Sequence, residues 1–137
     1  MTEPATPAGG TLYVLDTDTL VDVLRRRADV VARLDAVSPD DVRVSAASAA
    51  ELYYGALRSR DPAGNAATVD QLLAEVGVLA FGRSTARVHA RLRDALRAAP
   101  IGAFDLLIAA TAVAHGARAR RRWAREGGAS CVYTEPA

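Results

Sequence analysis

Residues 13–19 read Tyr-Val-Leu-Asp-Thr-Asp-Thr, and this stretch decides the fold. The apolar run from Leu12 to Leu15 has the length and composition of a buried strand, and it stops abruptly at the carboxylate of Asp16. The carboxyl ends of parallel strands open into the crevice where α/β proteins bind ligands. Asp16 is therefore predicted to lie at the ligand-binding edge of a parallel sheet.

Two further strands are predicted at residues 42–45 and 78–81, and a segment with helical spacing follows each strand. This alternation predicts an α/β domain in three layers, with a parallel twisted sheet and helices on both faces. A last helix, at about residues 104–115, is apolar nearly all round and should lie buried against the sheet until Gly116 ends it. The predicted helix N-caps are Asp18 or Thr19, Asp29, Ser45 or Ser48, Asp61 and Ser84.

Length and composition exclude several classes of protein. A chain of 137 residues is one domain with a sizeable core, and no apolar stretch is long enough to span a bilayer. The single cysteine, Cys131, excludes an internal disulfide framework and fits a reducing cytoplasm. All 17 basic residues are arginine, so the lysine of a P-loop and any Schiff-base mechanism are excluded. Residues 1–10 are predicted to be a disordered leader that is not a signal peptide.

The segment 117–137 does not fit the pattern, although the topology needs another apolar strand after Gly116. Five arginines fall between Arg118 and Arg125, and we expect such a run not to form a central strand because buried unpaired charges are costly. The prediction is instead a solvated helix extension or a disordered segment, with a late strand within residues 129–134. The chain thus divides into a leader (1–10), a domain (11–116) and an atypical arginine-rich segment (117–137).

Three acidic residues stand at comparable junctions of the predicted fold. Asp16 ends the first strand, Glu51 lies early in the helix after the second, and Asp105 lies in the first turn of the last helix. Carboxylates grouped at one edge repel one another unless a cation sits among them. Mg²⁺, or Mn²⁺ in its place, prefers such oxygen ligands. Taken singly, each acid could equally be a helix cap or a partner of the helix dipole.

Three motifs, at residues 14–18, 45–55 and 101–112, resemble a PIN domain, most closely the toxin subunit of VapBC-type toxin–antitoxin modules (the VapC family). The similarity covers about residues 12–116. It implies a PIN-like fold and a Mg²⁺-dependent endoribonuclease with Asp16, Glu51 and Asp105 as active-site acids. The resemblance further implies that Asp16 and Asp105 are direct metal ligands. The partners it implies are an RNA substrate, a cognate antitoxin and a second copy of the chain, with no membrane.

The chain departs from the family after Gly116, where PIN domains usually continue into an apolar strand and an acidic turn. The sheet is therefore expected to have four or five strands, and whether the usual last strand is present stays open. Glu135, which follows Thr134, faintly resembles a displaced acidic turn and is the candidate for a fourth carboxylate.

Two other functions remain open. The first is a degenerate PIN fold that only binds its antitoxin. The second is a phosphatase, because Asp16-Thr17-Asp18-Thr19 also satisfies a D-x-D-x-T pattern with a nucleophilic first Asp. The phosphatase family also uses a downstream basic residue, usually lysine, which this chain lacks.

Overall fold

The computed structural model of the chain describes residues 12–25, 41–120 and 132–133, and of residues 118–120 and 132–133 only the backbone. The strands are β1 (Tyr13–Leu15), β2 (Val42–Ser45), β3 (Val78–Leu79), β4 (Arg118–Arg120) and β5 (Val132–Tyr133). The helices are α1 (Thr17–Leu24), α3 (Ala46–Leu57), α4 (Pro62–Val76), α5 (Arg83–Ala95) and α6 (Ala103–Ala114). The predicted leader and the helix expected after Asp29 lie outside the described residues.

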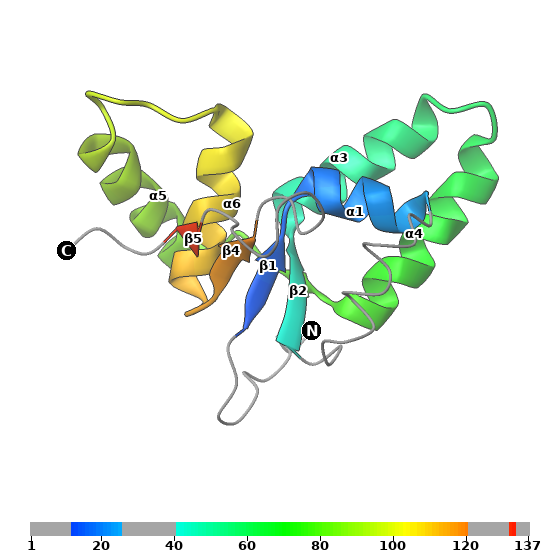
Figure 1. Cartoon of the computed structure of the whole chain (residues 1–137), viewed down its shortest axis with the longest axis horizontal. Helices are drawn as coiled ribbons and strands as arrows, with labels where there is room; N and C mark the ends of the chain where they lie inside the picture. Colours follow the sequence, from blue (N-terminus) through cyan, green and yellow to red (C-terminus); the bar gives the residue numbers. More distant parts are fainter. Residues whose placement is uncertain (1–11, 26–40, 121–131, 134–137) are drawn as a thin grey trace.

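The strands form one five-stranded sheet in the order β3-β2-β1-β4-β5, in which all neighbours are parallel except β4 and β5. Helices α3 and α4 lie to one side of β1 and β2, and α5 and α6 lie to the other (Figure 1). Since β1 and β2 are parallel, with Leu15 opposite Val44, both strands end at the same edge of the sheet. The predicted three-layer α/β fold is confirmed.

Strand β1 supplies core residues to both faces because successive side chains on a strand point to opposite sides. Leu15 packs into the cluster that contains Leu20 and Leu52, whereas Val14 packs with Ile108 on α6. Both strand side chains are fully buried. Each stabilises the fold by about 1.5–3 kcal/mol relative to an exposed position.

The expectation for the arginine run was wrong at residues 118–120. These residues form β4, which pairs in parallel with β1 and lies between β1 and β5. The prediction considered only the cost of burying charged side chains, whereas the pairing of strands is made by backbone N–H and C=O groups. The alternation of alanine and arginine over 117–120 also matches the two-residue period of a strand. The late strand expected within 129–134 is present as β5, so the sheet continues beyond residue 116.

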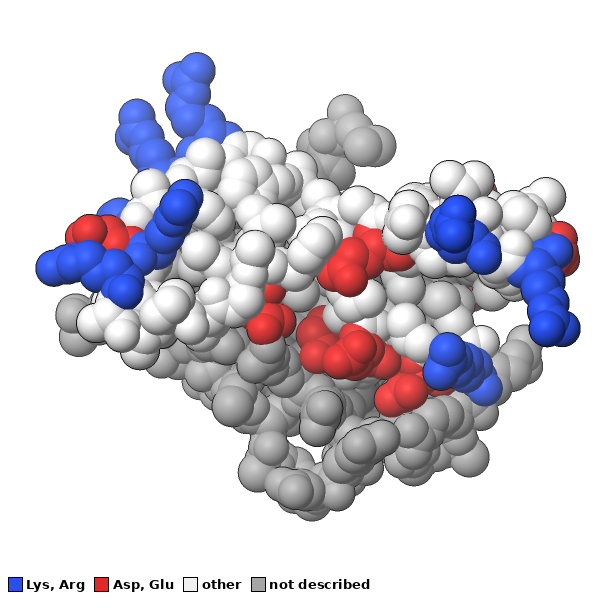
Figure 2. All heavy atoms as spheres, turned by 90° about the horizontal axis from the view of Figure 1, so that it is seen from above, with Lys and Arg blue, Asp and Glu red and all other residues white. Residues whose placement is uncertain are grey.

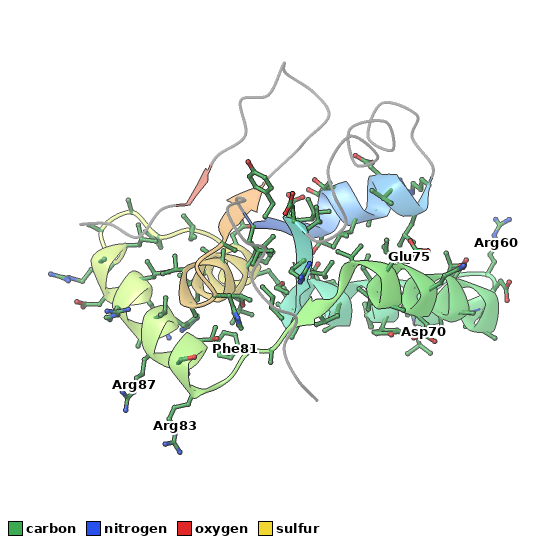
Figure 3. The ribbon with its side chains drawn as sticks, turned by 90° about the horizontal axis from the view of Figure 1, so that it is seen from below. Arg60, Asp70, Glu75, Phe81, Arg83 and Arg87 are labelled. Atoms are coloured by element: carbon green, nitrogen blue, oxygen red, sulfur yellow. The ribbon has the colours of Figure 1, made fainter. Side chains whose placement is uncertain are left out.

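Helices α3 and α4 form a hairpin in which a side-chain hydrogen bond joins the two helices. Asp61 caps α4 by accepting a hydrogen bond from the backbone N–H of Gly64 (3.1 Å), as predicted. The hydroxyl of Tyr53 on α3 donates a hydrogen bond to Oδ1 of Asp70 on α4, and Figure 3 labels Asp70. This bond holds the phenolic proton and raises the pKa of Tyr53 above its ordinary value.

Two smaller expectations have different outcomes. Ser84 does not cap α5, because that helix begins at Arg83 after Gly82 and has no side-chain cap. Helix α6 ends as predicted, with Gly116 in the left-handed conformation at φ +67° just after His115. Among the described helices, none has the length and apolar character needed to cross a membrane.

The two glycines Gly55 and Gly116 make a matched test of this backbone conformation. An added Cβ would meet nothing within 4 Å at either position. Gly55 lies inside α3, so Gly55→Ala should raise the free energy of unfolding by about 0.5–1 kcal/mol. Gly116→Ala should lower it by about 1–2 kcal/mol, because the left-handed conformation is strained for alanine. Urea denaturation measures both, and equal effects would contradict the assignment.

Candidate active site at the carboxyl edge of the sheet

Asp16 lies directly after β1 and is the N-cap of α1, so the predicted caps Asp18 and Thr19 are wrong. Its Oδ1 accepts a hydrogen bond from the backbone N–H of Thr19 at 3.0 Å, as a capping carboxylate does. The residue is only 7% exposed. Within the described part of the chain, Oδ2 of Asp16 accepts no hydrogen bond and is free for another partner.

Glu51 lies on α3, which follows β2, and Thr17 connects it to the start of α1. The hydroxyl of Thr17 donates a hydrogen bond of 3.0 Å to Oε1 of Glu51. Thr17 directly follows Asp16 in the chain, so this one bond couples the positions of two of the predicted acids. Among described residues, Thr17 is the one hydrogen-bond partner of the Glu51 carboxylate.

The hydroxyl groups of Ser45, Ser48 and Thr17 form a row joined by hydrogen bonds. The Oγ atoms of Ser45 and Ser48 lie 3.2 Å apart, and those of Ser48 and Thr17 also lie 3.2 Å apart. Each hydroxyl has a single hydrogen, and that of Thr17 is given to Glu51. Ser48 must then donate to Thr17, and Ser45 must donate to Ser48. Ser45 also caps α3 by accepting from the N–H of Ser48, which confirms it as the predicted cap.

Asp105 lies in the first turn of α6, whose N-cap Gly102 has no side chain to cap the helix. A Cβ at Gly102 would lie 3.4 Å from Oδ2 of Asp105, so the glycine stands directly beside this carboxylate. Asp105 is half-buried. A carboxylate in the first turn is favourable there because it faces the positive end of the helix dipole.

Acidic side chains gather around the middle of the face in Figure 2, which looks onto the edge where β1 and β2 end, and arginines lie at both outer ends. Within the described residues, no three side chains of His, Cys, Asp or Glu come close enough together to hold a metal ion. The carboxylate donors nevertheless fit Mg²⁺ by type. This ion is usually held by one or two carboxylates together with water and substrate phosphates. Glu135, the candidate fourth acid, lies outside the described residues.

Sequence reasoning singled out the acids, gave no role to the hydroxyl of Thr17, and considered that of Ser48 only as a possible helix cap. Both residues stand inside the quoted motifs, where Thr17 follows Asp16 and Ser48 precedes Glu51 by three positions. Residues three apart on a helix share a face. That spacing is the signal that could have placed Ser48 beneath Glu51, whereas the contact with Thr17 depends on how α1 and α3 pack.

An α/β fold with acidic residues at the carboxyl edge of a parallel sheet defines a class of proteins that bind ligands at that edge. Residues 13–119 match the PIN domain. The chain is 31% identical over 107 residues to Ribonuclease VapC2 of Haemophilus influenzae, which covers 76% of the chain and 80% of that protein. The chain belongs to the PIN domain family, and the fold expected from the resemblance is confirmed.

Two other proteins are similar to this chain. The tRNA(fMet)-specific endonuclease VapC of Shigella flexneri is 26% identical over 106 residues, covering 76% of the chain and 80% of that protein. The crystal structure of VapBC2 from Rickettsia felis, bound to a DNA fragment from their promoter, superposes with a TM-score of 0.72 at 25% identity. That match covers 80% of this chain and 85% of the other.

The link between α1 and α3 can be tested at Thr17. Thr17→Val keeps the shape of the side chain but leaves the Ser48 hydroxyl and the Glu51 carboxylate without their shared partner. We expect the free energy of unfolding to fall by about 1–3 kcal/mol. Thr17→Ser keeps the hydroxyl and should lose less stability in the same urea denaturation. A serine variant as unstable as the valine variant would contradict the role of the hydroxyl.

Proposed function

We propose that this chain is a Mg²⁺-dependent endoribonuclease that acts in the cytoplasm as the toxin of a toxin–antitoxin module. The observation that carries the proposal is the coupling of Asp16 to Glu51 through Thr17, on the side of the sheet where α6 begins with Asp105 in its first turn. The curated relatives support the reaction class, because one is named a ribonuclease and another a tRNA-specific endonuclease. The substrate class is therefore RNA.

In this proposal Asp16 and Asp105 hold the metal ion. Asp16 would bind through Oδ2, since its Oδ1 caps α1. When bound, Mg²⁺ would stabilise the charge that builds on a phosphodiester under attack. Placing both carboxylates at helix starts fixes their positions, because the backbone of each helix is rigid.

Glu51 is proposed to take a proton from the attacking water. Its Oε1 accepts the hydrogen bond of Thr17, which leaves Oε2 as the atom that can accept that proton. The row from Ser45 through Ser48 to Thr17 fixes the rotamer of Glu51 without adding charge. A base held in this way loses little freedom when the reaction begins.

The proposed partners are a cognate antitoxin and a second copy of the chain. The antitoxin is supported by the likeness to VapBC2 of Rickettsia felis. The homodimer follows from the resemblance of the three motifs to VapC toxins, and it stays a prediction. Glu135 as a fourth carboxylate also stays a prediction.

The proposed site can be tested by removing single carboxylate charges. Asp16→Asn keeps the helix cap, because asparagine caps as well as aspartate. This variant and Asp105→Asn should cut RNA at least about 100-fold more slowly, since each loses stabilisation of charge in the transition state. Induced wild-type protein should arrest bacterial growth, and both variants should relieve the arrest. Purified wild type should lose cleavage in EDTA and regain it with added Mg²⁺ or Mn²⁺.

Glu75→Gln is the matched control, because it removes one exposed carboxylate from α4, where Figure 3 labels it. It should cleave RNA and arrest growth as the wild type does. Unchanged cleavage by Asp16→Asn or Asp105→Asn would sink the metal-site proposal. Folded wild-type protein that neither cuts RNA nor arrests growth would favour the PIN fold that only binds its antitoxin.

A further inference from the structure

Helix α5 and the turn after it carry an unusual concentration of positive charge. Residues 83–97 contain five arginines and one aspartate, a net charge of +4 in a chain whose total is +1. Every one of these arginines is exposed. A helix with this charge is attracted to a polyanion and repelled by cationic surfaces.

The arginines are separated from the packed side of α5. Its buried residues are Thr85, Val88 and Leu92, of which Val88 and Leu92 pack against α6. Arg83 and Arg87 extend from the helix in the same direction in Figure 3. They are four residues apart and thus neighbours on one face. Neither forms an ion pair with a described residue, whereas Arg97 pairs with Asp94 at 3.2 Å.

This helix leads to the edge that carries the acids. The end of α5 and the start of α6 both lie toward the top of Figure 1, joined by residues 96–102, on the side where β1 and β2 end. The start of α5, with Arg83 and Arg87, lies at the other end of α6, where Nε2 of His115 is 3.1 Å from the backbone oxygen of Ala80. Phe104 stands there directly before Asp105, and it is 48% exposed although it is a large apolar side chain. An exposed aromatic ring beside a positively charged surface is typical of proteins that bind single-stranded nucleic acid by stacking and charge.

We propose that the exposed side of α5, together with Phe104, is the surface that holds single-stranded RNA beside the candidate active site. This inference rests on the proposed function and adds the substrate's binding surface to it. Arginines contact the phosphates through their planar forks of donors, and Phe104 stacks on a base next to Asp105. The acidic edge itself repels phosphate, so affinity for RNA has to come from a neighbouring basic surface.

The test measures RNA binding without cleavage. Asp16→Asn protein in Mg²⁺ is titrated into a fluorescein-labelled, single-stranded 20-nucleotide RNA of mixed sequence, and fluorescence anisotropy gives the affinity at several salt concentrations. Arg93→Gln with Arg97→Gln, at the end of α5 that leads to the acidic edge, should weaken binding about tenfold or more. It should also flatten the slope of log affinity against log salt by about 1.4, as expected for two lost phosphate contacts on a single strand.

The control pair is Arg58→Gln with Arg60→Gln, at the far end of the α3–α4 hairpin, where Figure 3 labels Arg60. It removes the same charge and should change the affinity less than threefold with the salt slope kept. Equal losses in the two pairs would overturn the inference, because binding would then follow net charge alone.

Phe104 is tested in the same assay. Phe104→Ala should weaken binding about tenfold through the lost stacking, with an unchanged salt slope. Tyr54→Ala, which removes an exposed aromatic ring from α3, should bind as the parent does. Unchanged circular dichroism and denaturation midpoints show that these surface variants fold.

A polyglutamate peptide at equal charge concentration separates RNA from an acidic protein partner. If it displaces the RNA as well as unlabelled RNA does, α5 is a surface for an acidic protein and the inference is wrong. Failure of the proposed function is a different result. Binding that depends on α5 in a wild-type protein that cannot cut RNA would remove the nuclease and leave the RNA surface standing.

Discussion

The parallel pairing of β1 with β2 is the constraint on which the rest of the molecule depends. Both strands run in one direction, so both end at the same edge, and the helices α1 and α3 start there. A residue at the end of a strand or early in the next helix is thereby brought to that edge whatever its separation along the chain. Asp16 and Glu51 are 35 positions apart, yet the hydroxyl of Thr17 links them. The site is thus a consequence of strand direction, and one hydrogen bond then sets its finer geometry.

Much of this architecture could be predicted from the sequence because its elements carry strong local signals. The apolar run before Asp16 predicts β1, and the apolar helix that ends at Gly116 predicts α6. Asp16 and Glu51 were placed at this edge by the same reasoning, since it needs only strand direction and element order. The position of Asp105 does not follow from strand direction, because α6 comes after helix α5 and not after a strand. Their roles in metal binding and catalysis stay predictions.

The parts that could not be predicted depend on contacts between elements, or on which of several suitable neighbouring residues caps a helix. Asp16, Asp18 and Thr19 are all suitable caps, and only the backbone conformation decides for Asp16, which is extended at ψ 169°. Strand β4 has no apolar pattern, and its place beside β1 is set by backbone pairing and by the packing of the preceding Ala117 with Leu12 and Val14. The bond from Thr17 to Glu51 depends on how two helices meet.

The short outer strands of the sheet have a consequence for the behaviour of the protein in concentrated solution. In the described part of the chain, the strands at the two borders, β3 and β5, have two residues each. An exposed sheet border can recruit a strand from another molecule and start aggregation, and very short border strands are one way in which natural proteins prevent this. Strand β4, which contains two arginines, lies between β1 and the border strand β5, so β1 is paired on both sides. The arginine-rich segment that looked least suited to a sheet therefore occupies the edge of the apolar strand β1, where a strand of another molecule could otherwise pair.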